Sequence, residues 1–312
     1  MPDVRRGHPL CRHRRSALWR QPCRSAGADR RRAVGGTAAG RAPFAWRPAA
    51  RCEPCAAAGL VGAASPAVSA QYDAIADRYR RTRASPLRRW VEIPSLLRLA
   101  GPVDGLRVLD LACGDGFYSR QLAAAGAAEV VGVDVSPAML ALAREASPPA
   151  GGPIDYILAD AAELPDLGRF DLVLAAYLLH YAPDTGTLAR MCGHVYRSLV
   201  DGGRLVAMSE NPAQPSEPPG GYAEYGFSKH CERPLVDGSR IRYQMLAGRD
   251  VFAFDVHWFS LETYERCLRD AGFDRLRWSP PAVDPAGLAL HGEAYFRRYL
   301  EYPPVLTLEC RR

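Results

Sequence analysis

The sequence predicts a doubly wound α/β fold built on one seven-stranded sheet. Between residues 107 and 209, short apolar runs alternate with stretches whose apolar residues recur at helical spacing. Strands that alternate with helices imply right-handed crossovers and a parallel sheet. Two later apolar runs, at 275–278 and 305–310, are expected to complete the sheet as an antiparallel pair at its edge.

Each predicted element follows from a local pattern. Residues 72–83 and 91–99 carry apolar side chains at helical spacing and are expected to form a helical lid ahead of the sheet. Ser136 is a predicted N-cap, and the Asp-Gly-Gly at 201–203 is a predicted helix stop. The parallel strands are predicted at 107–111, 130–133, 154–159, 170–175 and 204–209, and the helices between them at 118–125, 137–146 and 185–200.

The stretch 210–259 breaks this alternation. It opens with a proline-rich segment and then carries turn signals at 237–238 (Asp-Gly) and at 248–250, which are typical of β-hairpins. We therefore expect a small β cap inserted after the fifth strand. Ser260 then caps a predicted helix that runs to Ala271.

Residues 1–68 differ in composition from the rest and are expected to be a disordered segment, with 69–312 as the working domain. Arginine, alanine, proline and glycine dominate this segment, and no apolar periodicity persists. It is either a non-functional tail, including one encoded upstream of the true start, or a nucleic-acid-binding arm, and its few aromatic residues favour the tail. The remaining residues carry more acidic than basic side chains, so no nucleic-acid partner is expected.

The cysteines and the hydropathy pattern indicate where in the cell the protein is expected. The chain has nine cysteines, an odd number without a disulfide pattern, and Cys52-x-x-Cys55 lacks a second pair of zinc ligands. We expect reduced thiols and no metal. No apolar run is long enough to cross a membrane, and the Ala- and Gly-rich stretch before residue 70 does not fit a signal peptide. A cytoplasmic protein without a membrane partner is expected.

A glycine turn after the first predicted strand carries the strongest functional signal. The string Val-Leu-Asp-Leu-Ala-Cys-Gly-Asp-Gly occupies 108–116 and places a strand, a tight turn and a helix start in succession. Gly114 and Gly116 let the backbone approach a ligand, and the helix N-terminus offers free N–H groups. Asp134 lies at the predicted end of the second strand, where a carboxylate can take both ribose hydroxyls of a nucleoside.

Two features distinguish this turn from a dinucleotide-binding turn. Residue 119 is Ser rather than the third glycine of that fingerprint. Asp110 precedes the turn, and its negative charge would repel a pyrophosphate but attract the ammonium group of a methionine moiety. The pattern therefore favours S-adenosylmethionine (SAM) over a nicotinamide cofactor, and a nicotinamide-dependent oxidoreductase is kept as an alternative.

The segment 108–116 resembles the first motif of class I SAM-dependent methyltransferases, which have a Rossmann-like fold. Residues 134–140 are similar to the segment that binds the ribose and flanks the adenine in that family. Residues 160–161 are similar to its adenine-edge pair, and 199–205 to its lead into the fifth strand. The resemblance covers nearly all of 71–312.

Shorter stretches look like those of one subgroup, the toxoflavin synthase-like methyltransferases. These stretches are 72–76, 176–179, 225–227 and 302–305. In that subgroup the stretch that ends in Tyr-Ala-Pro usually has Asn where this chain has His180. The resemblance therefore implies the scaffold and not the substrate.

The resemblance also implies roles around the cofactor. Asp110 would orient the methionine amino group, and Asp134 would bind the ribose. Val135 and Met139 would sandwich the adenine, and Asp160 would accept from its amino group. Plain structural roles stay open as well, namely a turn cap for Asp110, an Asx-turn for Asp160 and core packing for Met139. The predicted cofactor-binding residues are Asp110, Ala112, Gly114, Gly116, Asp134, Val135, Met139, Asp160, Ala161 and Ala176.

Methyl transfer needs alignment and the exclusion of water more than acid–base help, because the sulfonium is already activated. His180 is the catalytic candidate, since an imidazole after the fourth strand could deprotonate an enol, phenol or ring N–H, or could merely line the pocket. His257 is a weaker candidate. Aromatic walls suit a flat acceptor. The predicted acceptor-binding residues are Tyr72, Tyr79, Tyr177, Tyr181 and Tyr225, with Tyr222 and Trp258 as further candidates.

The sequence thus predicts a SAM-dependent methyltransferase that acts on N, O or C of a small aromatic or heterocyclic metabolite, in specialised metabolism. Two more alternatives are a SAM-binding protein without methyl transfer and a nucleic-acid methyltransferase that uses the arginine-rich tail. The Asn/Asp-Pro-Pro-aromatic signature that holds a flipped base is missing, because the fourth strand ends in Ala175-Ala176-Tyr177.

Overall fold

The computed structural model describes residues 66–147, 152–214, 216–247 and 250–312. All of them lie within one unit of the chain, Ala58–Arg312. Most of the predicted tail, including Cys52 and Cys55, lies outside the described residues. Residues 66–68 of that predicted tail already belong to the first helix, α1 (Pro66–Asp73).

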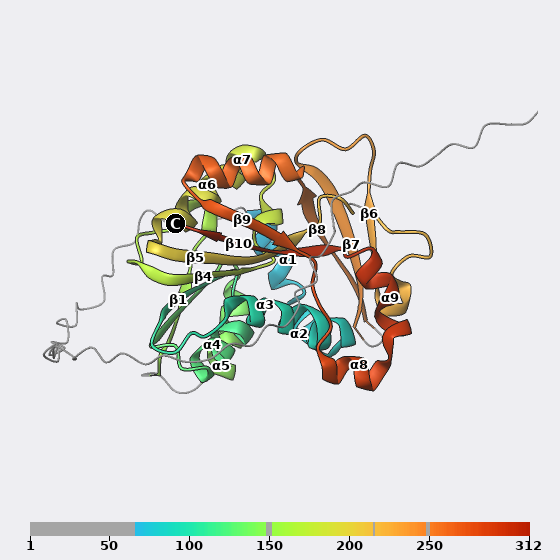
Figure 1. Ribbon diagram of the computed structural model, residues 1–312, viewed down its shortest axis with the longest axis horizontal. Helices are drawn as coiled ribbons and strands as arrows, with labels where there is room; N and C mark the ends of the chain where they lie inside the picture. Colours follow the sequence, from blue (N-terminus) through green and yellow to red (C-terminus); the bar gives the residue numbers. More distant parts are fainter. Residues whose placement is uncertain (1–65, 148–151, 215, 248–249) are drawn as a thin grey trace, which may run out of the picture. The chain divides into compact units, whose positions relative to one another are not determined.

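Seven strands form one mixed sheet (Figure 1). In the order in which they pair, they are β3 (Ile154–Leu158), β2 (Glu129–Asp134), β1 (Arg107–Leu111), β4 (Phe170–Ala176), β5 (Leu199–Glu210), β10 (Val305–Arg311) and β9 (Asp274–Ser279). Strands β1 to β5 run parallel to one another, whereas β10 is antiparallel to both β5 and β9. The predicted doubly wound sheet with an antiparallel pair at one edge is confirmed.

Helices cover both faces of this sheet. Helices α3 (Ile93–Ala100), α4 (Phe117–Ala124) and α5 (Pro137–Ala146) lie on one side, and α6 (Thr185–Arg197) and α7 (Leu261–Ala271) lie on the other (Figure 1). Side chains alternate along each strand. Leu172 and Leu174 of β4 pack with α3 and α4, whereas Val173 and Ala175 pack with α6 and α7. This double coverage explains the nearly continuous apolar strands.

The predicted β cap is confirmed as a separate antiparallel sheet. Its strands pair in the order β6 (Phe227–Cys231), β7 (Ser239–Ala247) and β8 (Asp250–Trp258). Val236 and Ser239 close the turn predicted at 237–238, and 248–249 lie outside the described residues. Side chains of α1 and α2 (Ala76–Arg81) pack against the cap, with Tyr72 and Ile75 in one apolar cluster with its inner face.

The single helix predicted at 72–83 is wrong, because the chain breaks between α1 and α2. Ile75 has a non-helical backbone at the break. The break frees Asp73, whose Oδ1 accepts hydrogen bonds from the Ser136 hydroxyl at 2.5 Å and the Ala138 N–H at 3.2 Å. Asp73 thereby helps Ser136, the confirmed N-cap, to accept hydrogen bonds from the free backbone N–H groups at the start of α5. Such a long-range cap is invisible to local periodicity.

The helix predicted at 185–200 also ends earlier than expected. The N–H of Phe170 donates to the Ser198 carbonyl at 2.8 Å, and Phe170 then pairs with Leu199. This sheet pairing draws residues 199–203 into β5 and ends α6 at Arg197. Two helices that the sequence analysis did not predict, α8 (Pro285–His291) and α9 (Glu293–Glu301), precede β10.

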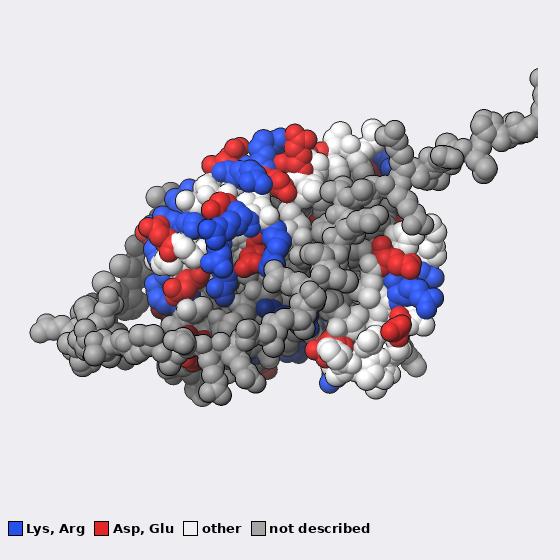
Figure 2. All heavy atoms as spheres, in the orientation of Figure 1, with Lys and Arg blue, Asp and Glu red and all other residues white. Residues whose placement is uncertain are grey.

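The surface of the described residues mixes charges of both signs. Figure 2 shows acidic and basic side chains interspersed on the visible face, among them those of α7. No helix among the described residues combines the length and the apolar character that a membrane span needs.

Candidate functional site

The glycine turn after β1 is held in a left-handed path. Ala112, Gly114 and Gly116 all have positive φ, at 57°, 55° and 71°, and the turn closes through the Gly116 N–H, which donates to the Cys113 carbonyl at 3.0 Å. A side chain at Gly116 would collide with the hydroxyl of Tyr156. Glycine is therefore required there both by backbone conformation and by space.

Asp134 ties this turn to the start of α5. Its Oδ2 accepts from the Gly114 N–H at 2.8 Å, and its Oδ1 accepts from the Ser136 N–H at 2.9 Å. Burial raises the pKa of Asp134, and its bonds to backbone N–H groups oppose that rise. The carboxylate is therefore fixed at the tips of two neighbouring strands.

A cavity of about 820 Å³ opens beside this turn. We call it the first cavity. Its lining includes all the predicted cofactor-binding residues except Asp110 and Gly116, and it adds residues from α1 and α6 that were not predicted. The first cavity is lined by Val68, Tyr72, Tyr79, Ala112, Gly114, Val133, Asp134, Val135, Met139, Ala159, Asp160, Ala161, Ala176, Tyr177, Leu178, Tyr181, Pro183, Thr187 and Met191.

Asp110 lies outside the lining and is fully buried. Its Oδ2 accepts from the Ser119 hydroxyl at 2.6 Å, whereas its Oδ1 has no hydrogen-bond partner among the described residues. The pKa of Asp110 is raised to about 7, chiefly by burial and also by the nearby Asp134, and the bond from Ser119 opposes this rise. An unpaired buried carboxylate oxygen is costly, and a cationic group at this turn would relieve that cost.

Asp160 lines the first cavity and also caps a short 3₁₀ turn, η3 (Ala161–Glu163). Its Oδ1 accepts from the Ala162 N–H at 2.8 Å. The Asx-type arrangement that the sequence left open is therefore present. Because the residue also lines the cavity, the cap and the predicted contact with a ligand are compatible.

A second cavity, of about 630 Å³, adjoins the first. Tyr79, Tyr177 and Tyr181 line both cavities, so their side chains form the shared wall. Of the predicted acceptor-binding residues, Tyr72 lines only the first cavity and Tyr225 only the second. The second cavity is lined by Tyr79, Ser85, Leu87, Arg88, Glu92, Tyr177, His180, Tyr181, Glu210, Tyr225, Phe227, Tyr243, Met245, Phe254, Val256, Pro304 and Val305.

Tyr177 occupies this shared wall with a strained backbone. Its φ is 64°, which is unusual for a bulky residue and is characteristic of functional sites. Its hydroxyl donates to Oε2 of Glu92 at 2.5 Å, and the Tyr299 hydroxyl donates to Oε1 of the same carboxylate at 2.6 Å. The guanidinium carbon of Arg88 lies 5.1 Å from the centre of the Tyr177 ring, and its Nε lies 3.7 Å from Oε2 of Glu92. The wall is thus held by a buried network.

Sequence reasoning missed Arg88 and Glu92. Glu92 stands beside apolar residues in the stretch predicted as a helix, and it is one turn from Arg88. A carboxylate with an i, i+4 arginine partner on an apolar helix was the available signal. The helical turn η2 (Arg88–Glu92) that carries both is π-helical, a feature often found at functional sites.

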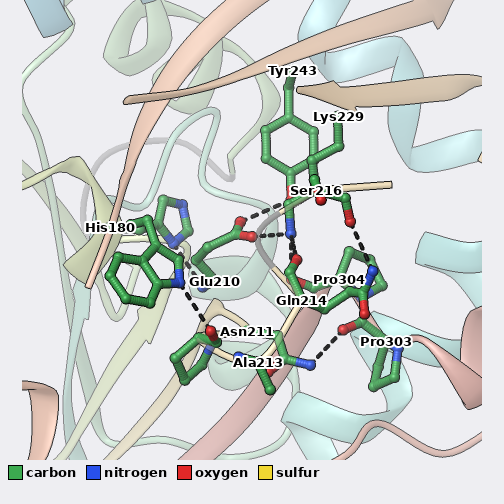
Figure 3. Close-up of polar contacts among 12 residues, drawn as sticks. His180, Glu210, Asn211, Ala213, Gln214, Ser216, Lys229, Tyr243, Pro303 and Pro304 are labelled. Carbon is green, nitrogen blue, oxygen red and sulfur yellow. Dashed lines mark hydrogen bonds and ion pairs between the residues drawn. The ribbon is translucent and has the colours of Figure 1, made fainter. Parts of the chain in front are cut away.

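His180 and Glu210 line the second cavity from the ends of β4 and β5 (Figure 3). Lys229 of β6 is fully buried and forms an ion pair with the Glu210 carboxylate. The hydroxyl of Tyr243 donates to Oε2 of Glu210 at 2.8 Å. Burial lowers the pKa of Lys229 and raises that of Glu210, and the pair opposes both shifts. The negative charge of Glu210 is therefore compensated within the protein.

Three further candidates from the sequence do not line either cavity. Tyr222 is fully buried, and its hydroxyl donates to the Tyr302 carbonyl at 2.6 Å. The Trp258 indole donates to the Pro212 carbonyl at 2.9 Å. His257 is also outside both linings. Tyr222 and Trp258 are thus engaged with backbone carbonyl groups of the protein.

Comparison with known proteins agrees with this geometry. A family model described as "Methyltransferase domain" matches residues 108–203. A ubiquinone biosynthesis O-methyltransferase from Azorhizobium caulinodans is 41% identical over 95 residues, which are 30% of this chain and 37% of that protein. The matches to the first curated relatives cover between 37% and 55% of their own length.

Solved structures extend the likeness to most of the sheet. A SAM-dependent methyltransferase from Mesorhizobium loti has a TM-score of 0.53 at 24% identity and covers 74% of this chain and 100% of its own. The [4+2]-cyclase SpnF has a TM-score of 0.53 at 18% identity and covers 81% of this chain and 97% of its own. These likenesses concern the fold alone. The family match identifies residues 108–203 as a methyltransferase domain, and the glycine turn and the likeness in fold to a SAM-dependent methyltransferase agree with it.

Proposed function

We propose that this chain transfers the methyl group of SAM to N, O or C of a small aromatic or heterocyclic metabolite. One observation carries the proposal. Most of the predicted cofactor-binding residues line the first cavity, four of the five predicted acceptor-binding tyrosines line the second, and Tyr79, Tyr177 and Tyr181 lie between the two. A donor and an acceptor bound on either side of this wall would meet at it.

The residues of the first cavity fit SAM. Asp134, fixed by two backbone N–H groups, would bind the ribose hydroxyls, and Val135 and Met139 would flank the adenine. Asp110 has an unpaired, buried oxygen near the turn, as expected for a residue that complements the cationic methionine end. When bound, SAM supplies a methyl group already activated as a sulfonium.

The chain itself would align the methyl donor with the acceptor and exclude water from them. In the aromatic wall Tyr181 is buried and Tyr177 is half-buried, so the wall would exclude water from the point where the two cavities meet. The strained backbone of Tyr177 and its bond to Glu92 hold that wall rigid. Proximity and orientation of this kind can supply much of the rate in a transfer from an activated donor.

The second cavity suits a flat, neutral acceptor. Seven of its seventeen lining residues are Tyr or Phe, and its carboxylates, Glu92 and Glu210, already have partners within the protein. The curated relative named as an O-methyltransferase supports oxygen as one target. Specialised metabolism in the cytoplasm is the setting we propose.

The test is a methyl-transfer assay with radiolabelled SAM and a panel of phenols, catechols and nitrogen heterocycles. We expect release of S-adenosylhomocysteine (SAH) and a product heavier by one methylene group for at least one acceptor class. A protein that binds neither SAM nor SAH in calorimetry would contradict the proposal. Binding of NADH in their place would favour the oxidoreductase alternative.

A second candidate function is SAM binding without methyl transfer. The likeness in fold to a [4+2]-cyclase favours it, because a related scaffold performs a reaction of another class. This candidate predicts that SAM binds but that no panel member causes SAH release above the background without acceptor. The two candidates therefore differ in one measured quantity, acceptor-dependent SAH release.

A further inference from the structure

The imidazole of His180 is held from one edge by strand β5. His180 lies in the 3₁₀ turn η4 (Leu179–Tyr181) after β4, and it is buried while lining the second cavity. The backbone N–H of Glu210 donates to its Nδ1 at 3.1 Å, and the Ser209 hydroxyl lies 3.2 Å from the same nitrogen. Figure 3 shows this nitrogen turned toward Glu210 and the other ring nitrogen turned away.

These contacts decide the tautomer. A backbone N–H can only donate, so Nδ1 must accept and cannot carry a hydrogen. The Ser209 hydroxyl can rotate to donate to Nδ1 as well, and it has Tyr264 as a further neighbour at 3.3 Å. A neutral imidazole whose Nδ1 accepts carries its proton on Nε2. No described residue forms a hydrogen bond with Nε2, so this N–H is available to a ligand.

The charged form of the ring is disfavoured by the same surroundings. A proton on Nδ1 would face the Glu210 N–H directly. The pKa of His180 is lowered to about 3, chiefly by burial and also by the positive charge of Lys229 and the nearby His257. The Glu210 carboxylate is already engaged by Lys229 and Tyr243, so it is not free to stabilise an imidazolium.

We infer that His180 is locked as an Nε2–H donor that binds a hydrogen-bond-accepting oxygen or ring nitrogen of the methyl acceptor. This inference rests on the proposed function for the identity of the ligand, but not for the state of the ring. It replaces the general base that the sequence suggested with a substrate-binding residue. A base at this position would need a free lone pair on Nε2, and the Glu210 N–H forbids the tautomer that has one.

The ring state is measured without any acceptor. A long-range ¹⁵N–¹H correlation spectrum of histidine-labelled protein near neutral pH distinguishes the two tautomers. We expect His180 to show a protonated Nε2 and an unprotonated Nδ1. His180→Leu assigns the signal, and if this variant fails to fold, exchange of the other six histidines one at a time assigns it by elimination; they are His8, His13, His194, His230, His257 and His291. A proton on Nδ1 would overturn the inference.

The contact with a ligand is measured with a matched pair of probes. Quinoline and naphthalene have nearly the same shape, but only quinoline offers a nitrogen acceptor. In protein saturated with SAH, we expect quinoline to shift the Nε2–H proton resonance of His180 downfield and naphthalene to leave it in place. The same response to both probes, including none, would overturn the contact. If His180 shows the expected tautomer but the protein does not bind SAH, the proposed function fails and the inferred ring state stands.

Discussion

The backbone N–H of Gly114 donates to Oδ2 of Asp134 across 2.8 Å, so the glycine turn and the tip of β2 are joined at the first cavity. The same carboxylate accepts from the Ser136 N–H. It therefore serves the fold and, in our proposal, the ribose.

Replacing Asp134 with Ala is expected to weaken SAM binding by about thirtyfold, or about 2 kcal/mol, because hydrogen bonds to a charged group are lost. Asp155→Ala on neighbouring β3 is the matched control, since Asp155 is exposed and lines neither cavity. Calorimetric titration with SAM measures both variants. Equal affinities in the two variants would remove Asp134 from the cofactor site.

Replacing Gly116 with Ala should destabilise the protein more than replacing Gly105 does. Both glycines have a φ near +70°, at 71° and 73°, but an added Cβ meets Tyr156 at Gly116 and open space at Gly105. Backbone strain alone costs about 1 to 2 kcal/mol, and overpacking adds about 1 to 3 kcal/mol. Urea unfolding of the two variants gives the difference. Equal losses would mean that Tyr156 moves aside freely.

SAM binding should release protons through Asp110. Its pKa of about 7 in the free protein leaves the carboxyl half protonated near neutral pH, and a bound ammonium group favours the ionised form. Affinity should therefore rise as the pH is raised from about 6 to about 8. Titration in two buffers of different ionisation enthalpy counts the released protons. Asp110→Asn should abolish the release, and identical heats in both buffers for the natural protein would contradict this role.

The contributions of the buried residues Lys229 and Glu210 to the free energy of unfolding should be strongly coupled. Removing one partner, as in Lys229→Met, leaves the other charge buried and is expected to cost about 3 to 5 kcal/mol of unfolding free energy. Lys229→Met combined with Glu210→Gln should cost less than the sum of the two single changes. Urea unfolding of the four proteins completes the cycle. Strict additivity would show that the pair does not interact in solution.

Two N-terminal deletions should distinguish the contribution of the arginine-rich tail to SAM binding from that of helix α1. Deleting residues 1–57 is expected to leave SAM affinity within about twofold of the full chain, because Val68 and Tyr72 of the first cavity are retained. Deleting residues 1–73 removes α1 and should weaken binding. A large loss from the shorter deletion would give the arginine-rich segment a function and revive the nucleic-acid alternative.

The cofactor half of the site could be predicted from the sequence because its geometry is local. Gly114 and Asp160 follow parallel strands and Asp134 ends one, and the carboxyl ends of such strands meet at one edge of the sheet. Ser136 and Ser260 were recognisable as caps for the same reason. Asp110 and Gly116 do not line the first cavity, because Asp110 is buried and Gly116 shapes the turn, and their roles at the cofactor stay predictions.

The acceptor half could not be predicted in this way. Arg88, Glu210 and Tyr243 come together only when η2, β5 and the cap pack on one another, and periodicity says nothing of that packing. The state of His180 depends on the N–H of Glu210, which is distant in sequence. Even the start of α5 is capped in part by Asp73, which lies at the end of α1 and is distant in sequence. Contacts between residues distant in sequence therefore determine the protonation state and the position of these side chains, which the residue types alone do not predict.

The most direct measurement is a crystal structure of the protein with SAH. We predict that SAH occupies the first cavity, with its ribose at Asp134, its adenine between Val135 and Met139, and its sulfur toward Tyr177. Electron density for SAH at any other place, or a protein that remains free of it at saturating concentration, would contradict the account.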